Sequence, residues 1–268
     1  MSMRVALSTI LGLFSVFQIP LVLGSPLDKV LKHHVFIKHE EMRVCGGIAV
    51  SSNEIITSAS CLSSSSANSI QVTSFGSATH PFSHDHAVID KCIPDNFDVK
   101  ANDHTNDIAI LRLREPIVND DSNTTFGTIE IAEPDLKFND QTIMQVVGYV
   151  FDPKGTSDSS IKMSSINLSR IPIRRENDVI GVGAGDLSIV LGACNGTGGV
   201  SAFIGNKLVG LTTNWKPDCD TKPGSPIIFT SISHTRFFID ECLAKFRSKD
   251  YSFAHKVKEL LWSFTLWG

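Results

Sequence analysis

Short runs of β-forming residues recur along most of this 268-residue chain, and they restrict its fold more than any other feature. Glycine, proline, asparagine and aspartate separate the runs, and no long helical period alternates with them as it would in a parallel α/β protein. The pattern predicts an all-β sandwich or barrel. The runs lie at residues 34–38, 44–50, 54–61, 70–73, 108–113, 142–147, 188–191 and 208–212.

The first 24 residues have the features of a secretory signal peptide. Arg4 precedes an apolar run at residues 5–23, and the small residues Val22 and Gly24 precede the expected cleavage point. A membrane anchor is the alternative, but Pro20 and several hydroxyl side chains interrupt the run. We therefore predict a secreted, extracellular protein.

The cysteines and sequons fit export. An exported chain passes through an oxidising compartment, so its six cysteines are read as a disulfide set. Asn123, Asn167 and Asn195 each begin an Asn-X-Ser/Thr sequon and are candidate glycosylation sites. The formal net charge is −4, and the sequence has neither a basic stripe nor an acidic tail. This argues against nucleic acid as a partner.

Only the C-terminal part of the chain has a helical pattern. Residues 233–246 are compatible with a helix, and in the tail at 248–268 the residues Val257, Leu260, Leu261 and Phe264 recur at helical spacing. This amphipathic tail either packs on the β domain or docks on a partner or a membrane surface.

Five short segments stand out along the chain: CGGI at 45–48, ITSASC at 56–61, NDIAILRL at 106–113, CNGTGG at 194–199 and GLTT at 210–213. They occur in the order and at about the spacing found in the trypsin/chymotrypsin family, and the chain resembles that family from about Cys45 to Cys242. The resemblance implies a chymotrypsin-like fold of two six-stranded antiparallel β-barrels, with a C-terminal helix. It places a trypsin-like domain at 45–247, after a short segment at 25–44 without an activation site.

The catalytic positions implied by the resemblance are degenerate. Ser60 stands where the family has its histidine base, and a hydroxyl cannot accept a proton near neutrality as imidazole does. Asp107 keeps the aspartate position, where we expect it to have nothing to orient. Thr197 replaces the serine nucleophile after a one-residue deletion, which also shortens a turn whose amides each contribute about 3 kcal/mol to transition-state binding.

The substrate pocket and the activation site also depart from the family pattern. Gly192 best matches the base of the pocket, where a trypsin has aspartate, and Thr213 lies in the pocket wall. Trp215 or Ile227 stands where glycine is needed, so a narrowed cleft is expected. An Ile-Val-Gly-Gly terminus is missing together with its aspartate partner, so neither charge of that ion pair is buried alone.

The resemblance implies two disulfides, Cys45–Cys61 and Cys194–Cys219. Cys92 and Cys242 match no bridge expected in the family, but the fold brings the strand before Asp107 close to the C-terminal helix. We expect these two to pair, with two free thiols as the alternative.

Three histidines, His80, His84 and His86, lie in a segment that corresponds to a calcium-binding loop of some trypsins. Imidazoles favour zinc or copper, and a His-X-His pair in an extended chain has both rings on one side. The alternative is a solvated loop that holds no metal.

We therefore expect a secreted, catalytically inactive serine protease homologue that acts by binding, without a cofactor. Its partner would be an extracellular protease, inhibitor or substrate of a proteolytic cascade. The alternatives are a residual hydrolase that uses Thr197 and a metal-binding extracellular module.

Overall fold

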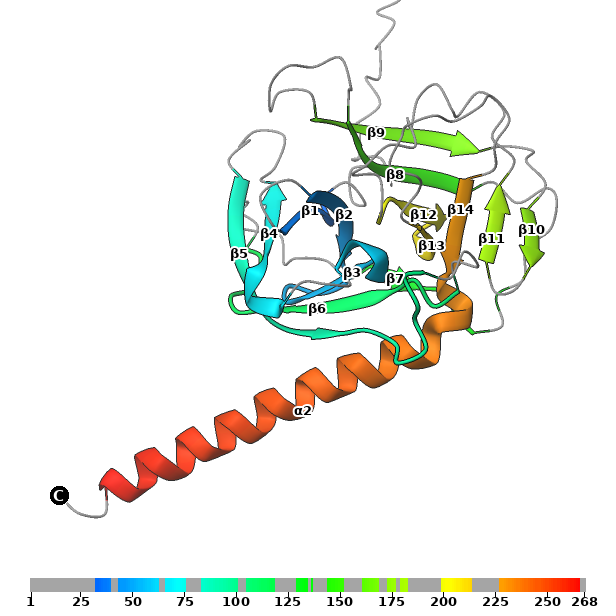
Figure 1. Cartoon of the computed structure of the whole chain (residues 1–268). Helices are drawn as coiled ribbons and strands as arrows, with labels where there is room; N and C mark the ends of the chain where they lie inside the picture. Colours follow the sequence, from blue (N-terminus) through cyan, green and yellow to red (C-terminus); the bar gives the residue numbers. More distant parts are fainter. Residues whose placement is uncertain are drawn as a thin grey trace, which may run out of the picture.

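The computed structural model describes residues 32–39, 43–62, 66–75, 83–100, 105–118, 129–134, 136, 144–151, 161–168, 173–176, 179–182, 199–213 and 227–265. Strands dominate these segments and fall into two sets that pack against each other (Figure 1). One long helix follows the last strand. Of the β runs expected from the sequence, only 188–191 lies wholly outside the described residues.

The first set is a closed six-stranded barrel in which every neighbouring pair is antiparallel. Its strand order is β1-β2-β3-β6-β5-β4. The strands are β1 (His34–His39), β2 (Arg43–Ala49), β3 (Glu54–Thr57), β4 (Ile70–Phe75), β5 (Ser83–Cys92) and β6 (Ala109–Leu113).

Aliphatic side chains fill this barrel. Ile37, Ile55, Val72 and Leu111 are at most 1 % exposed and belong to one cluster. In strand β1, His34, Val35, Phe36 and Ile37 are all buried. The second strand set covers part of this barrel, as the contact of His34 with Phe203 shows.

The second set is an eight-stranded sheet with the order β10-β11-β14-β13-β12-β8-β9. The short strand β7 pairs with β13 in parallel, and the other pairs are antiparallel. The two-barrel, chymotrypsin-like architecture expected from the sequence is confirmed. The strands are β7 (Glu130–Ile131), β8 (Met144–Phe151), β9 (Ile161–Leu168), β10 (Ile173–Glu176), β11 (Val179–Val182), β12 (Ser201–Ile204), β13 (Lys207–Thr212) and β14 (Ile227–Ser231).

A shared apolar core joins the two halves. Ile48 and Ile110 of the first barrel belong to the same buried cluster as Phe203, Leu208 and Phe229 of the second sheet. Each of these side chains is 0 % exposed. The two halves therefore fold as one packed body.

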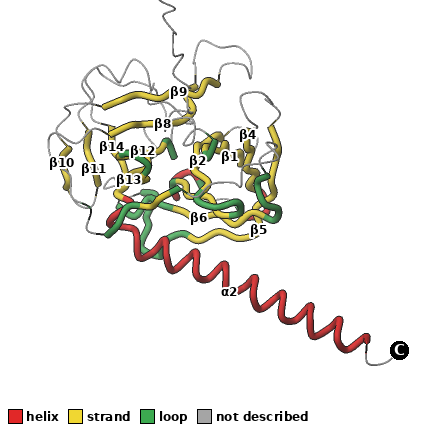
Figure 2. Tube along the Cα trace, turned by 180° about the vertical axis from the view of Figure 1, so that it is seen from behind, coloured by secondary structure: helices red, strands yellow, loops and turns green. Residues whose placement is uncertain are grey.

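Helix α2 (Ile232–Thr265) is continuous through the point at which the sequence analysis separated a domain from a tail. Its first turns are fixed to the body, because Ser233 donates a hydrogen bond to the carbonyl of Pro134 and Arg236 donates to the carbonyls of Ile131 and Ala132. The helix then runs out beyond the barrels in both views (Figures 1 and 2). Among the helices that the structure describes, none is long and apolar enough to cross a membrane.

Candidate functional site: the degenerate catalytic positions

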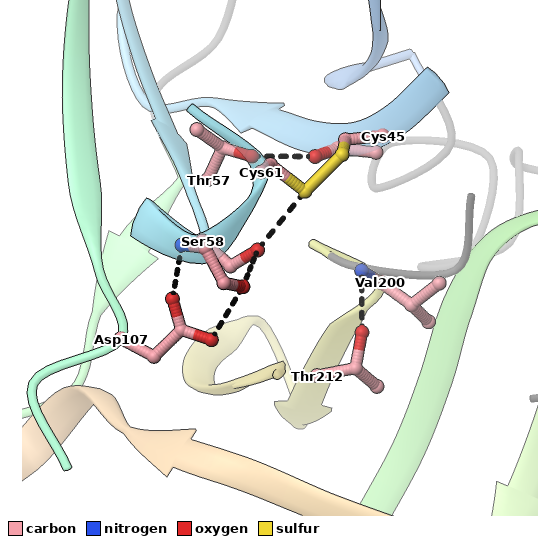
Figure 3. The surroundings of a disulfide bond; sticks show 9 residues. Cys45, Thr57, Ser58, Cys61, Asp107, Val200 and Thr212 are labelled. Atoms are coloured by element: carbon pink, nitrogen blue, oxygen red, sulfur yellow. Dashed lines mark hydrogen bonds between the residues drawn. A yellow bond between two sulfur atoms is a disulfide. The ribbon is translucent and has the colours of Figure 1, made fainter. Parts of the chain in front are cut away.

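Ser60 lies in a single 3-10 turn, η1 (Ala59–Cys61), that directly follows strand β3. Ala59 and Cys61 are buried on either side of it, so Ser60 is left partly exposed. Two links hold the turn against β2. They are the Cys45–Cys61 disulfide and a 2.7 Å hydrogen bond from the Thr57 hydroxyl to the carbonyl of Gly46 (Figure 3).

Asp107 lies just before strand β6 and is 1 % exposed. The preceding residue, Asn106, has a φ of 55°, in the left-handed region that asparagine tolerates better than most residues. From β14, the Thr230 hydroxyl donates a 3.2 Å hydrogen bond to the backbone carbonyl of Asp107. The segment is thus fixed from the second strand set as well as from its own barrel.

The structure brings Ser60 and Asp107 into direct contact. The backbone N–H of Ser60 donates to Oδ1 of Asp107 at 2.7 Å, and its hydroxyl donates to Oδ2 at 2.8 Å. Both carboxylate oxygens therefore accept a hydrogen bond from the same residue, which offsets the cost of burying the carboxylate. The expectation that Asp107 has nothing to orient is wrong, because it holds the Ser60 hydroxyl.

A chain of weaker polar contacts continues from Ser60 into the barrel. Its hydroxyl lies 3.5 Å from the hydroxyl of Ser58, which in turn donates to Sγ of Cys61 at 3.2 Å. Figure 3 shows this chain between Asp107 and the disulfide. The groups in this chain are two serine hydroxyls and a disulfide sulfur, and none of them can serve as a general base near neutrality.

The end of the nucleophile loop is fixed at Gly199 and Val200. Gly199 donates its N–H to the carbonyl of Thr212 at 3.0 Å, and Val200 donates to the Thr212 hydroxyl at 2.9 Å. Thr212 returns a bond from its own N–H to the carbonyl of Val200 at 2.8 Å. Thr212 is therefore the main anchor of this segment, a role that the sequence analysis did not assign.

Gly199 also requires glycine for two separate reasons. Its φ of 81° is in the left-handed region, and a Cβ atom there would lie 1.9 Å from the carbonyl oxygen of Gly46. The loop backbone thus packs directly on strand β2. Gly46 belongs to the CGGI motif and Gly199 to the CNGTGG motif, and these glycines are the sequence signal for the contact.

The remaining catalytic and pocket residues are only partly described. Thr213 is buried directly after β13, and Ile227 is the first residue of β14. Thr197, Gly192 and Trp215 lie outside the described residues. The predicted narrowing of the cleft therefore stays a prediction.

Two of the three expected disulfides fall in the described part of the chain, and both are formed. Cys45 pairs with Cys61, and Cys92 pairs with Cys242 across 150 residues. The second bridge rules out the alternative of two free thiols. Cys194 and Cys219 are outside the described residues.

Of the three sequons, only Asn167 is described, in strand β9 opposite Gln145 of β8. Asn123 and Asn195 lie outside the described segments, and glycan occupancy stays a prediction at all three.

His84 and His86 lie in strand β5, so the expectation that they belong to a loop is wrong. The two histidines are two residues apart, so they share one face of β5. This strand pairs with β4, in which Ser74 lies opposite His84 and Val72 lies opposite His86. His86 Nε2 is 2.8 Å from the Ser74 hydroxyl, and burial lowers the pKa of His86, with a further lowering from the nearby His84.

The metal hypothesis rests on residues that are only partly described. His80 is outside the described residues, and the described ones contain no group of three or more histidine, cysteine, aspartate or glutamate side chains arranged to hold a metal. A role for His80, His84 and His86 in metal binding stays a prediction.

Comparisons with known proteins agree with this architecture. The chain is similar to two crystal structures of inactivated protease paralogues from the scabies mite. Paralogue S-I1 has 19 % identity and a TM-score of 0.63, with 81 % of this chain and 96 % of that one covered. Paralogue S-D1 has 17 % identity and a TM-score of 0.60, with 81 % and 94 % covered.

No curated protein matches the sequence significantly. The sequence model of the trypsin family, however, matches residues 28–239, which is most of the chain. Together with the closed first barrel and the strands packed against it, this match shows that the chain belongs to the trypsin family.

Proposed function

We propose that this protein is a secreted, catalytically inactive serine protease homologue that acts by binding another extracellular protein. The observation that carries the proposal is the pairing of Ser60 with Asp107, because the hydroxyl and amide of Ser60 occupy both carboxylate oxygens. A catalytic aspartate in this family orients an imidazole that takes the proton of the nucleophile. Here the residue that Asp107 orients cannot take that proton.

The nucleophile position supports the same conclusion. Thr197 follows Gly196 directly, so the loop lacks one residue and has a more crowded hydroxyl than serine would provide. Loss of the base and alteration of the nucleophile remove different steps of acyl transfer, and neither change compensates for the other. The scabies mite structures are named inactivated protease paralogues, which is a precedent for this fold without protease activity.

A signal-like N-terminus and two bridged cysteine pairs favour function outside the cell. A folded trypsin-like body without catalysis retains its loops as a binding surface. A protease, an inhibitor or a substrate of an extracellular cascade is the class of partner that such a surface fits. The role would be that of a decoy, cofactor or regulator.

A fluorophosphonate probe tests the catalytic part of the proposal. We expect no covalent labelling of the mature protein under conditions that label trypsin fully, and no cleavage of peptide ester substrates. Labelling at Thr197 would overturn the proposal, because it would show an activated hydroxyl.

Two single variants separate the missing base from the altered nucleophile. Thr197→Ser supplies serine but no base, whereas Ser60→His supplies an imidazole beside Asp107 but leaves the shortened loop. We expect both to stay inactive while their circular dichroism spectra match that of the parent protein. Hydrolysis by Thr197→Ser alone would show that a base is supplied from elsewhere.

Affinity capture tests the binding part. The mature protein would be immobilised on a resin and incubated with the fluid into which it is secreted. A reporter domain immobilised through a Gly-Ser linker would serve as the control bait. Selective recovery of a protease or protease inhibitor supports the proposed class of partner. Recovery of only the proteins that the reporter also captures would count against it.

A further inference from the structure

The second sheet has two edges among the strands that the structure describes. Its order begins with β10 and ends with β9, and each of these strands pairs with a single described neighbour. In both views β9 lies along the margin of the sheet, with β8 as the only labelled strand beside it (Figures 1 and 2). The backbone N–H and C=O groups along such an edge are a template for pairing with a second chain, so proteins usually protect them.

Strand β10 has the protection that a short, charged strand provides. It is four residues long, and three of the four are Arg174, Arg175 and Glu176. Short length and charged side chains are two of the common means by which proteins prevent an edge strand from pairing. This edge of the sheet therefore needs no further protection.

Strand β9 has neither of these features. It is eight residues long, contains no proline, and has one charged residue, Lys162, near its start. All eight residues pair with β8 in an uninterrupted register, so no bulge twists this edge away from a partner. Near its other end β9 contains Asn167, the first residue of the sequon Asn167-Leu168-Ser169. A bulky group on this asparagine would obstruct the edge that charge and length leave open.

The register places Asn167 on the face of β9 that is opposite to the core. Its two neighbours in β9 lie opposite Met144 and Val146 of β8, which are at most 1 % exposed and belong to the shared core. Asn167 itself lies opposite the partly exposed Gln145, and residues directly opposite each other share a face. Val147, two residues further along β8, is buried, so Gln145 marks the exposed end of this face. A glycan attached at Asn167 therefore displaces no part of the core.

We propose that Asn167 carries an N-linked glycan, and that this glycan prevents the edge of β9 from pairing with a second copy of the chain. The proposal rests on the secretory part of the proposed function, because the export route supplies the donor, a lipid-diphosphate-linked oligosaccharide. In the transfer, a bond forms between the amide nitrogen of Asn167 and the first carbon of the oligosaccharide. The bond from that carbon to the diphosphate oxygen breaks, and the amide proton leaves with the released lipid diphosphate.

Peptide mass spectrometry of the full chain, expressed in secretory eukaryotic cells, tests the modification. Enzymatic removal of N-glycans in heavy-oxygen water converts each modified asparagine to a labelled aspartate. We expect the label at position 167 in most copies of the secreted protein. Secreted protein without this label would overturn the present proposal alone, whereas a chain that stays unmodified in the cytosol would overturn the secretory part of the proposed function as well.

Three variants of the sequon test the protective role. Asn167→Gln removes the acceptor, and Ser169→Ala keeps the acceptor but removes the hydroxyl residue that the sequon requires. Ser169→Thr is the matched control, because it changes the same residue and keeps the sequon. We expect the first two proteins to lack the glycan and to form concentration-dependent oligomers in sedimentation. The Ser169→Thr protein should sediment as a monomer, as the parent does, and all four should have the same circular dichroism spectrum.

Hydrogen exchange identifies the edge that pairs. In the Asn167→Gln protein, the amides of residues 161–168 should exchange more slowly at high than at low protein concentration, because a second copy pairs with them. The amides of residues 173–176 should exchange at the same rate at both concentrations. Variants without the sequon that remain monomeric, or equal slowing at both edges, would overturn the protective role. None of these measurements depends on whether the protein is catalytically inactive.

Discussion

Single residues around the Ser60–Asp107 pair are held by close contacts. Asp107 is buried and fully engaged by Ser60, and Gly199 packs on Gly46. A buried carboxylate without donors would destabilise the fold, so a hydroxyl at position 60 is a stable replacement for imidazole. A serine at position 60 therefore need not weaken this part of the structure.

Gly199→Ala should destabilise the protein by about 2–4 kcal/mol. The new Cβ would overlap the carbonyl of Gly46, and alanine also disfavours the positive φ. Gly205→Ala is the control, because φ there is +60° but no atom lies within 4 Å of the added carbon, so a loss of only about 1–2 kcal/mol is expected. Urea unfolding of both variants measures the difference, and equal losses would contradict the role of the Gly46 contact.

Among the elements, α2 is joined to the first barrel by a covalent bridge that crosses 150 residues of sequence. Removing it with Cys92→Ser and Cys242→Ser together should lower the free energy of unfolding by about 2–4 kcal/mol. Hydrogen exchange should also become faster at residues 239–249, because the helix loses its covalent link to β5. The matched Cys45→Ser, Cys61→Ser protein should keep the helix protected, and equal exchange in both would argue against the anchoring role.

The elements that could be predicted from the sequence are those whose own residues indicate the secondary structure. The apolar-rich runs at 54–57 and 109–113 became β3 and β6, and the pairing of Cys92 with Cys242 followed from the fold implied by five short motifs. The placement of His84 and His86 in a loop was wrong because polar histidines suit a loop as well as a partly exposed strand such as β5. The two hydrogen bonds from Ser60 to Asp107 join residues 47 positions apart, and no local pattern predicts them.

At the scale of the whole molecule, the two strand sets share one core, and a titratable group lies where they meet. His34 of β1 is 1 % exposed, and its ring meets the edge of Phe203 of β12 at a centroid distance of 6.3 Å. Burial lowers the pKa of His34 from its ordinary value of 6.5 to about 3, with a smaller contribution from His33. Burial lowers the pKa of His33 as well, against the effect of its hydrogen bond with the carbonyl of Ala49.

These shifts predict that acid weakens the junction between the two halves. In the unfolded chain His34 gains a proton near pH 6.5, whereas in the folded chain it does so only near pH 3, so between these values the unfolded state binds more protons. The folding stability that depends on a neutral His34 is therefore fully present above about pH 6.5. It is lost as the pH falls toward 3, by up to about 1.4 kcal/mol per pH unit. Urea unfolding measured across this range should show the decline, and His34→Phe should make it shallower because the aromatic contact is kept without a titratable nitrogen. A Ser69→His variant, which adds an exposed histidine, should retain the slope of the parent. A His34→Phe profile as steep as that of the parent would show that other groups cause the decline.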